Sequence, residues 1–175
     1  MQKDIDKQTA KTLATMIDSH LIWYKHYFPW TDEIIANNSD TPSWILNLST
    51  VKYIPDAVKT INEYVYSEPF EPFDEAKYSD QFVACLYLRY QSGAISWASF
   101  LSEAGRYVDA SYGRHECEYF FMMLNEYEDS EYAEKLKKKQ SKEMLQEFSD
   151  VIQFIKDLYS PFRKYFRTYK EKYKA

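Results

Sequence analysis

Glycine is scarce in this 175-residue chain, and its scarcity limits the folds available. The three glycines, Gly93, Gly105 and Gly113, lie within one 21-residue stretch, whereas average usage of about 7% predicts roughly twelve. P-loop and dinucleotide-binding turns need two or three closely spaced glycines, because backbone N–H groups must approach a phosphate. Tight β-hairpins favour Asn-Gly, Asp-Gly or Gly-Gly, and none of these dipeptides occurs in the sequence. The sequence therefore predicts helices rather than sheets.

The composition is that of a folded globular domain. Hydrophobic residues make up 45% of the chain and aromatic residues 18%, which excludes intrinsic disorder. A mean hydropathy of −0.60 with 28% charged residues argues against a membrane span. A chain of this length suits one domain and buries enough surface to form a core without disulfides. We therefore expect a single all-α domain over residues 1–175, built from about six or seven helices.

Three strongly apolar segments, 74–92, 95–108 and 114–127, are expected at the centre of the fold. Their apolar side chains recur at a spacing of three to four residues, which is typical of helices that bury one face. Gly93 follows the first segment at the position of a left-handed C-cap. Gly105 lies inside the second segment, where it indicates a close approach of two backbones.

Prolines divide the rest of the chain. Apolar periodicity predicts a first helix over 4–28, ended by Pro29. The Pro-rich segment 67–73 cannot continue a helix and is expected to be an internal linker. From 129 to 175 there is no glycine and a single proline, so we expect one long helix with a kink at Pro161.

Charge is segregated along the chain. Residues 135–175, the basic part of the expected C-terminal helix, carry 12 basic and five acidic side chains. Residues 116–134 carry seven carboxylates and no Lys or Arg. Segregation of this size steers encounters with charged partners. The alternative is that the basic terminal helix packs on the acidic body and neutralises it, because charge runs are usually solvated faces.

The segment 116–132 combines six acidic side chains with three tyrosines. Tyrosine is enriched at protein–protein hot spots because it joins a large rigid ring to a polar tip, and the chain has 17 tyrosines. Tyrosine also replaces Phe or Leu at half-buried positions, so both interpretations stay open. As a binding surface, the segment would match a basic protein partner. The expected partner-binding residues are Glu116, Glu118, Tyr119, Glu126, Tyr127, Glu128, Asp129, Glu131 and Tyr132.

The C-terminal segment interleaves aromatic and basic side chains. This combination binds single-stranded nucleic acid in other proteins, through base stacking and phosphate contacts. It also suits binding to an anionic membrane surface. The aromatic residues recur as one helical stripe, which favours a core face with the basic residues in water. The alternative function is therefore a nucleic-acid-associated factor that uses Arg163, Lys164, Arg167 and Lys170. The stripe consists of Ile155, Leu158, Tyr159, Phe162, Tyr165, Phe166, Tyr169 and Tyr173, and the expected core face begins before it, at Phe148.

The sequence contains no pattern typical of catalysis or metal binding. His20 and His26 are six residues apart, so on one helix they point about 240° away from each other and cannot share a metal. His115 and Glu118 could share a face, but no second His or Cys pair completes a zinc or di-iron site. We therefore predict no catalytic residue, no metal and no cofactor. A helical enzyme without a recognisable motif is the second alternative.

Both cysteines lie in apolar runs. The surroundings of Cys85 and Cys117 favour buried free thiols in a reducing compartment over a disulfide framework. The first seven residues lack the apolar region of a signal peptide, so a cytoplasmic location is expected.

The overall character of the chain resembles one class of bacterial proteins. Its small size, acidity, aromatic content and lack of catalytic motifs are similar to those of immunity proteins, which bacteria keep against their own toxins. The most distinctive local stretch is 88–101, LRYQSGAISWASFL. The resemblance implies a protein that binds a toxin domain and blocks it without a cofactor, and it carries over no individual functional residue.

Overall fold

The computed structural model describes residues 5–111 and 113–172 and is all-helical over these residues. The prediction of an all-α fold is thus confirmed, with no strand in the described part of the chain. The described residues form nine helices, more than the six or seven expected. Tyr173, the last member of the expected aromatic stripe, lies outside the described residues. None of the described helices is both long and apolar enough to cross a membrane.

Contacts between Cα atoms divide the chain into two compact units. Unit 1 comprises the residues up to Phe73 together with those from Asp157, and unit 2 comprises Asp74–Lys156. The second boundary falls within the last helix, α9 (Ser149–Lys172). The expectation of one domain stays a prediction.

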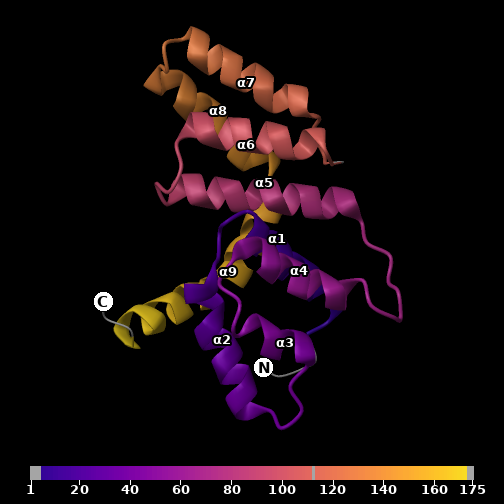
Figure 1. Ribbon diagram of the computed structural model, residues 1–175. Coiled ribbons are helices and arrows are strands. Elements are labelled where there is room, and N and C mark those ends of the chain that lie inside the picture. Colours follow the sequence, from indigo (N-terminus) through magenta and orange to yellow (C-terminus); the bar gives the residue numbers. More distant parts are fainter. Residues whose placement is uncertain (1–4, 112, 173–175) are drawn as a thin grey trace. The chain divides into compact units, whose positions relative to one another are not determined.

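Unit 1 is built from the first four helices and the C-terminal part of α9. α1 packs against α4, α3 packs against α4, and α2 packs against α3 (Figure 1). The Pro-rich segment after α4 is non-helical, and the side-chain amine of Lys7 donates hydrogen bonds to the carbonyls of Ser67 and Pro69 within it. The bounds are α1 Lys7–Asp18, α2 Tyr24–Asn37, α3 Ser43–Leu48 and α4 Ile54–Val65.

The expected helix over 4–28 is two helices, with a break at His20. His20 has a φ of 60°; its N–H donates to Ile17 O at 2.9 Å, and the N–H of Leu21 donates to Met16 O at 3.0 Å. This pair of bonds is a Schellman C-cap, which usually places glycine where His20 lies. The expected stop at Pro29 was wrong, because Pro29 lies inside α2.

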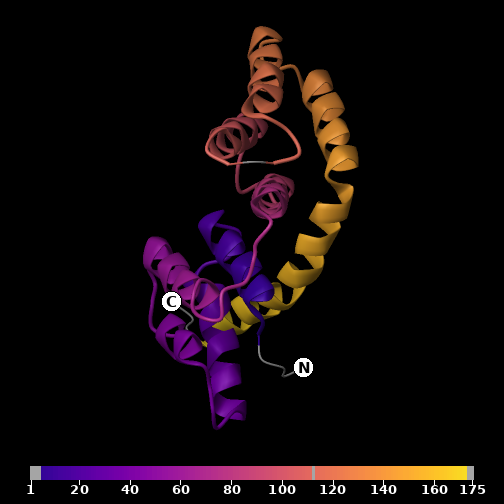
Figure 2. The same ribbon diagram turned by 90° about the vertical axis from the view of Figure 1, so that its right-hand side faces the viewer.

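Unit 2 contains the three apolar segments that were expected at the centre of the fold. They form α5 (Glu75–Gln91), α6 (Trp97–Asp109) and α7 (Cys117–Asp129), which lie one upon the next in both views (Figures 1 and 2). Gly93 ends α5 with a φ of 75°, so the predicted left-handed C-cap is confirmed. Gly105 is also a point of close approach, although its neighbour is a side chain: a Cβ there would lie 2.7 Å from the Phe121 ring of α7.

The expected long C-terminal helix is interrupted at Phe148, where α8 (Glu134–Glu147) ends and α9 begins. The Phe148 side chain is 1% exposed and lies beside the rings of Phe120 and His115. Arg114 Nη1 donates to the carbonyl of Glu147, which satisfies a backbone acceptor at this helix end. Helix α9 continues through Pro161, so the helix break lies at Phe148, and the kink expected at Pro161 stays a prediction.

Candidate functional site

The outward face of α7 is acidic and carries one large apolar side chain at its centre. Its exposed residues follow one another at helical spacing, so they share one side of the helix. Met122 is 63% exposed in the middle of them. We call this set the acidic face; it consists of Glu118, Met122, Asn125, Glu126 and Asp129.

The carboxylates of the acidic face make no ion pair within the part of the chain that the structure describes. Among the described residues, no Lys, Arg or His lies within ion-pair distance of Glu118, Glu126 or Asp129. The backbone N–H of Glu118 and the Cys117 thiol hold the pKa of the Glu118 carboxyl below its usual value, so this group is charged at neutral pH. The negative field of the acidic face is therefore directed toward solvent.

Helix α8 contacts α7 without pairing its lysines with these carboxylates. The buried residues of α8 are Gln140 and Met144. Among described residues, the one ion pair made by a lysine of α8 is internal, between Lys137 and Glu134. Direct ion pairing between α7 and α8 thus does not neutralise the acidic segment. The exposed lysines of α8 are Lys135, Lys138, Lys139 and Lys142.

Buried hydrogen bonds of Gln140 position α7. Its Nε2 donates to the carbonyl of Met123 at 2.9 Å and to Glu126 Oε2 at 3.3 Å, while its Oε1 accepts from Trp97 Nε1. One side chain of α8 thereby connects α6 and α7 and holds a carboxylate of the acidic face.

The three expected tyrosine anchors differ in their exposure. Tyr127 is 8% exposed and belongs to the core of unit 2, so its side chain is not part of an open surface. Tyr132 is 57% exposed and lies edge-on to Tyr127, with 5.3 Å between ring centroids. Tyr119 is half-buried and stacks on His115 at 3.9 Å. Of the three tyrosines, Tyr132 is the most exposed, and the buried Tyr127 ring packs against it.

The other expected binding residues are exposed at the two ends of α7. Glu131 and Tyr132, in the turn to α8, have φ values of 54° and 61°. Residues other than glycine adopt positive φ only at a cost, and such positions cluster at functional sites. The sequence did not predict this backbone conformation. It also did not predict that Met122 is exposed, because an apolar residue in an apolar helix is expected to be buried. The exposed carboxylates of this group are Glu116, Glu128, Asp129 and Glu131.

Cys117 is half-buried, and its thiol lies between two carboxylates. Its Sγ is 3.2 Å from Glu118 Oε2 and 3.4 Å from Asp109 Oδ1. The hydrogen bond to Glu118 is the main cause that raises the pKa of the thiol to about 11. A thiol with so high a pKa is a poor nucleophile at neutral pH. The expectation that both thiols are buried holds for Cys85 and was wrong for Cys117; neither Cys85 nor Cys117 forms a disulfide.

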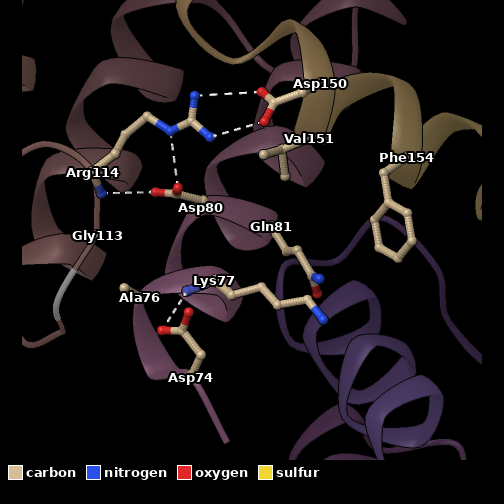
Figure 3. Close-up of a pocket in the computed structure, with 10 residues that line it drawn as sticks. All are labelled: Asp74, Ala76, Lys77, Asp80, Gln81, Gly113, Arg114, Asp150, Val151 and Phe154. Carbon is tan, nitrogen blue, oxygen red and sulfur yellow. Dashed lines mark hydrogen bonds and ion pairs between the residues drawn. The ribbon is translucent and has the colours of Figure 1, made fainter.

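Unit 2 also has an open hollow of about 450 Å³ beside Arg114 (Figure 3). The Arg114 guanidinium lies between Asp80, at 2.9 Å from Nε, and Asp150, at 3.3 Å from Nη2. Its backbone N–H also donates to Asp80 at 2.9 Å. The guanidinium holds the pKa of Asp150 below its usual value. Because Arg114 uses its charge to tie α5 to the start of α9, we assign it a structural role.

The basic residues of the alternative function lie on the exposed side of α9. Arg163, Lys164, Arg167 and Lys170 are all solvent-exposed. Phe148 and Phe162 are buried, so the prediction that they are core residues is confirmed.

Metal-ligating side chains do not converge in the described part of the chain. No group of three or more His, Cys, Asp or Glu side chains there could hold a metal ion. Comparison of the chain with protein-family models, with curated proteins and with solved structures gave no match.

Proposed function

We propose that the chain is a non-catalytic protein-binding module that captures a basic protein through the acidic face of α7. The observation that carries the proposal is Met122, which is 63% exposed at the centre of a face whose charged side chains are all acidic. An exposed methionine costs solvation free energy unless a partner covers it. Methionine also adapts to irregular partner surfaces.

The carboxylates around Met122 suit the polar rim of a protein–protein interface. Rim charges direct the encounter and fix its orientation, while a central apolar side chain supplies contact area. Glu118, Glu126 and Asp129 flank Met122 along the helix, and Tyr132 adds an exposed ring in the turn that follows. A partner with a basic surface and a shallow apolar depression would match this arrangement.

The resemblance to immunity proteins suggests that the partner is a toxin. A toxin that cuts or modifies nucleic acid has a basic cleft, because it must bind phosphates. The acidic face would occupy such a cleft and exclude the substrate. The proposal is thus an immunity-type inhibitor that acts by steric and electrostatic blocking, with no cofactor.

A pull-down from the native host with three immobilised proteins tests the proposal. The double variant Met122→Ser/Asp129→Lys changes the centre and rim of the acidic face. Glu143→Lys is the matched control, because Glu143 is an exposed carboxylate on α8. We expect the wild type and Glu143→Lys to retain the same basic protein, with retention that weakens as salt rises. The double variant should lose it.

Two results would contradict the proposal. One is the absence of any retained protein at low salt; the other is a protein retained equally by all three baits. Co-expression of the captured protein with the chain then tests inhibition, because an immunity-type inhibitor must restore growth to cells that the partner harms.

A further inference from the structure

Aromatic rings of α2 and α9 meet at one surface of unit 1. Trp23 and Tyr24 lie at the start of α2, and Phe166 and Tyr169 lie on α9. The Trp23 and Phe166 rings are 5.4 Å apart in a T-shaped pair, and the Tyr24 and Tyr169 rings are 5.9 Å apart. All four residues are half-buried, so each keeps part of its surface in solvent. We call these four residues the aromatic platform.

Basic side chains from three segments lie over this platform. The ammonium groups of Lys25 and Lys52 are 5.9 Å and 5.6 Å from the centroid of the Tyr24 ring. Lys170 Nζ is 4.9 Å from the centroid of the Phe166 ring. Lys25 belongs to α2, Lys52 to the connection before α4, and Lys170 to α9. The fold of unit 1 therefore gathers charges that are far apart in the sequence.

The exposed side of α9 extends the positive charge beyond the platform. Arg163, Arg167 and Lys170 follow one another at four- and three-residue spacing, so they share one face of the helix. No carboxylate lies within ion-pair distance of them in the described residues. The three cations are thus available to an anionic ligand.

We infer that the aromatic platform and its cations bind single-stranded nucleic acid. Bases stack on aromatic rings whatever their sequence, and Lys and Arg side chains near the rings contact the phosphates. Because Phe166 already stacks on His26, the half-buried rings of Trp23 and Tyr24 supply the stacking surface. This activity is separate from the capture of a protein by α7, and either one can fail without the other.

The packing of α9 disfavours a membrane surface as the ligand. A helix that lies in a membrane interface inserts its apolar face among the lipids. In the part of α9 that belongs to unit 1 this face is already covered: the His26 ring stacks on Phe166 at 4.6 Å, and Trp30 lies 5.6 Å from Phe162, which is 8% exposed. The open side of α9 presents Arg163, Arg167 and Lys170, which suits phosphate contact without insertion.

The chain has a net charge of −5, so an anionic ligand must be attracted by the cations close to the platform rather than by the chain as a whole. At an ionic strength of 0.1 M, charges more than about 10 Å apart are largely screened from one another. The cations at the platform therefore act on a nearby phosphate with little opposition from distant carboxylates. Affinity must fall steeply with salt, because each phosphate contact releases counterions.

Fluorescence anisotropy of a labelled oligodeoxythymidine of about 15 nucleotides tests the inference on the whole 175-residue chain. We expect binding whose salt slope falls by about one for each lysine removed in Lys52→Gln and Lys170→Gln. Tyr24→Leu should weaken affinity roughly tenfold or more through lost stacking. Lys59→Gln is the control, since Lys59 is an exposed lysine on α4 of the same unit. Circular dichroism checks that every variant is folded.

Four results would overturn the inference. They are no binding at low salt, equal loss in Lys59→Gln, an unchanged affinity in folded Tyr24→Leu, and tighter binding to the duplex of the same length. A fifth comparison uses vesicles that contain anionic phosphatidylglycerol. Binding to these vesicles without binding to the oligonucleotide would assign the surface to membranes instead.

Discussion

The indole Nε1 of Trp97 donates a hydrogen bond to Oε1 of Gln140 across 2.9 Å, and both side chains are buried. Trp97 begins α6 and Gln140 lies in the middle of α8, so this bond connects two helices that are distant in the sequence. Gln140 uses its amide nitrogen on the carbonyl of Met123 in α7. Both ends of one buried amide are therefore satisfied by neighbouring helices.

Replacing Gln140 should destabilise the helices that carry the acidic face. In Gln140→Leu the buried Trp97 N–H loses its acceptor, and an unsatisfied buried group costs about 1 to 3 kcal/mol. Gln146→Leu is the matched control, because Gln146 is exposed on the same helix and surface changes usually stay within about 0.5 kcal/mol. Chemical denaturation measures both. Equal free energies of unfolding for the two variants would show that the Gln140 bonds contribute nothing.

Two Glu→Gly substitutions, one in the turn after α7 and one inside α8, should change the free energy of unfolding in opposite directions. Glu131 has a φ of 54°, a conformation that costs about 1 to 2 kcal/mol for a residue with a Cβ. Glycine removes this cost and adds about 0.5 to 1 kcal/mol of backbone entropy to be lost on folding. Glu131→Gly should therefore raise the free energy of unfolding by up to about 1.5 kcal/mol. Glu143→Gly, inside α8, should lower it by about 1 kcal/mol.

Sequence periodicity predicted the helices whose apolar spacing is uninterrupted. The segment 74–92 became α5, whose middle residues Val83 to Leu86 are at most 1% exposed. Gly93 was recognised as a C-cap because glycine is the usual residue at positive φ. His20 and Glu131 also have positive φ after a helix end, but neither is a glycine. The sequence therefore contained no sign that α1 and α7 end there.

The exposure of the two candidate surfaces could be predicted only in part, because burial depends on tertiary contacts. The run of carboxylates was visible in the sequence, but the exposure of Met122 and the burial of Tyr127 depend on which side of α7 meets its neighbours. The four basic residues of α9 were also visible. The convergence of Lys25 and Lys52 on Tyr24 depends on how α2 and the segment before α4 pack, which residue spacing does not encode.

His26 should make the protein less stable in mild acid. Burial lowers the pKa of His26 from 6.5 to about 4, and its ring stacks on Phe166. Below pH 6.5 the unfolded chain binds a proton at this site that the folded chain excludes, so stability falls as the pH drops from about 6.5 to about 4. The full effect is of the order of 3 kcal/mol, since one pKa unit corresponds to about 1.4 kcal/mol.

Denaturation of variants at several pH values isolates this contribution from that of the carboxylates. His26→Gln keeps a side-chain acceptor but cannot titrate, so its stability should fall less between pH 6.5 and 4 than that of the wild type. The wild type, measured at the same pH values, is the reference for this slope. Parallel pH profiles for wild type and His26→Gln would contradict the assignment.

Phe162 separates a core role of α9 from a role in binding. Its side chain is 8% exposed and lies against Trp30, whereas Phe154, two turns earlier on the same helix, is 44% exposed. Removing a buried Phe typically costs about 3 to 5 kcal/mol. At about 2 to 4 °C per kcal/mol for a chain of this size, Phe162→Ala should lower the melting temperature by roughly 10 °C. Phe154→Ala should lower it far less, because little buried area is lost. If the two variants melt together near the wild-type temperature, Phe162 is not a core residue. The apolar face of α9 would then be free to insert into a membrane, and the argument that favours nucleic acid over lipid would fail with it.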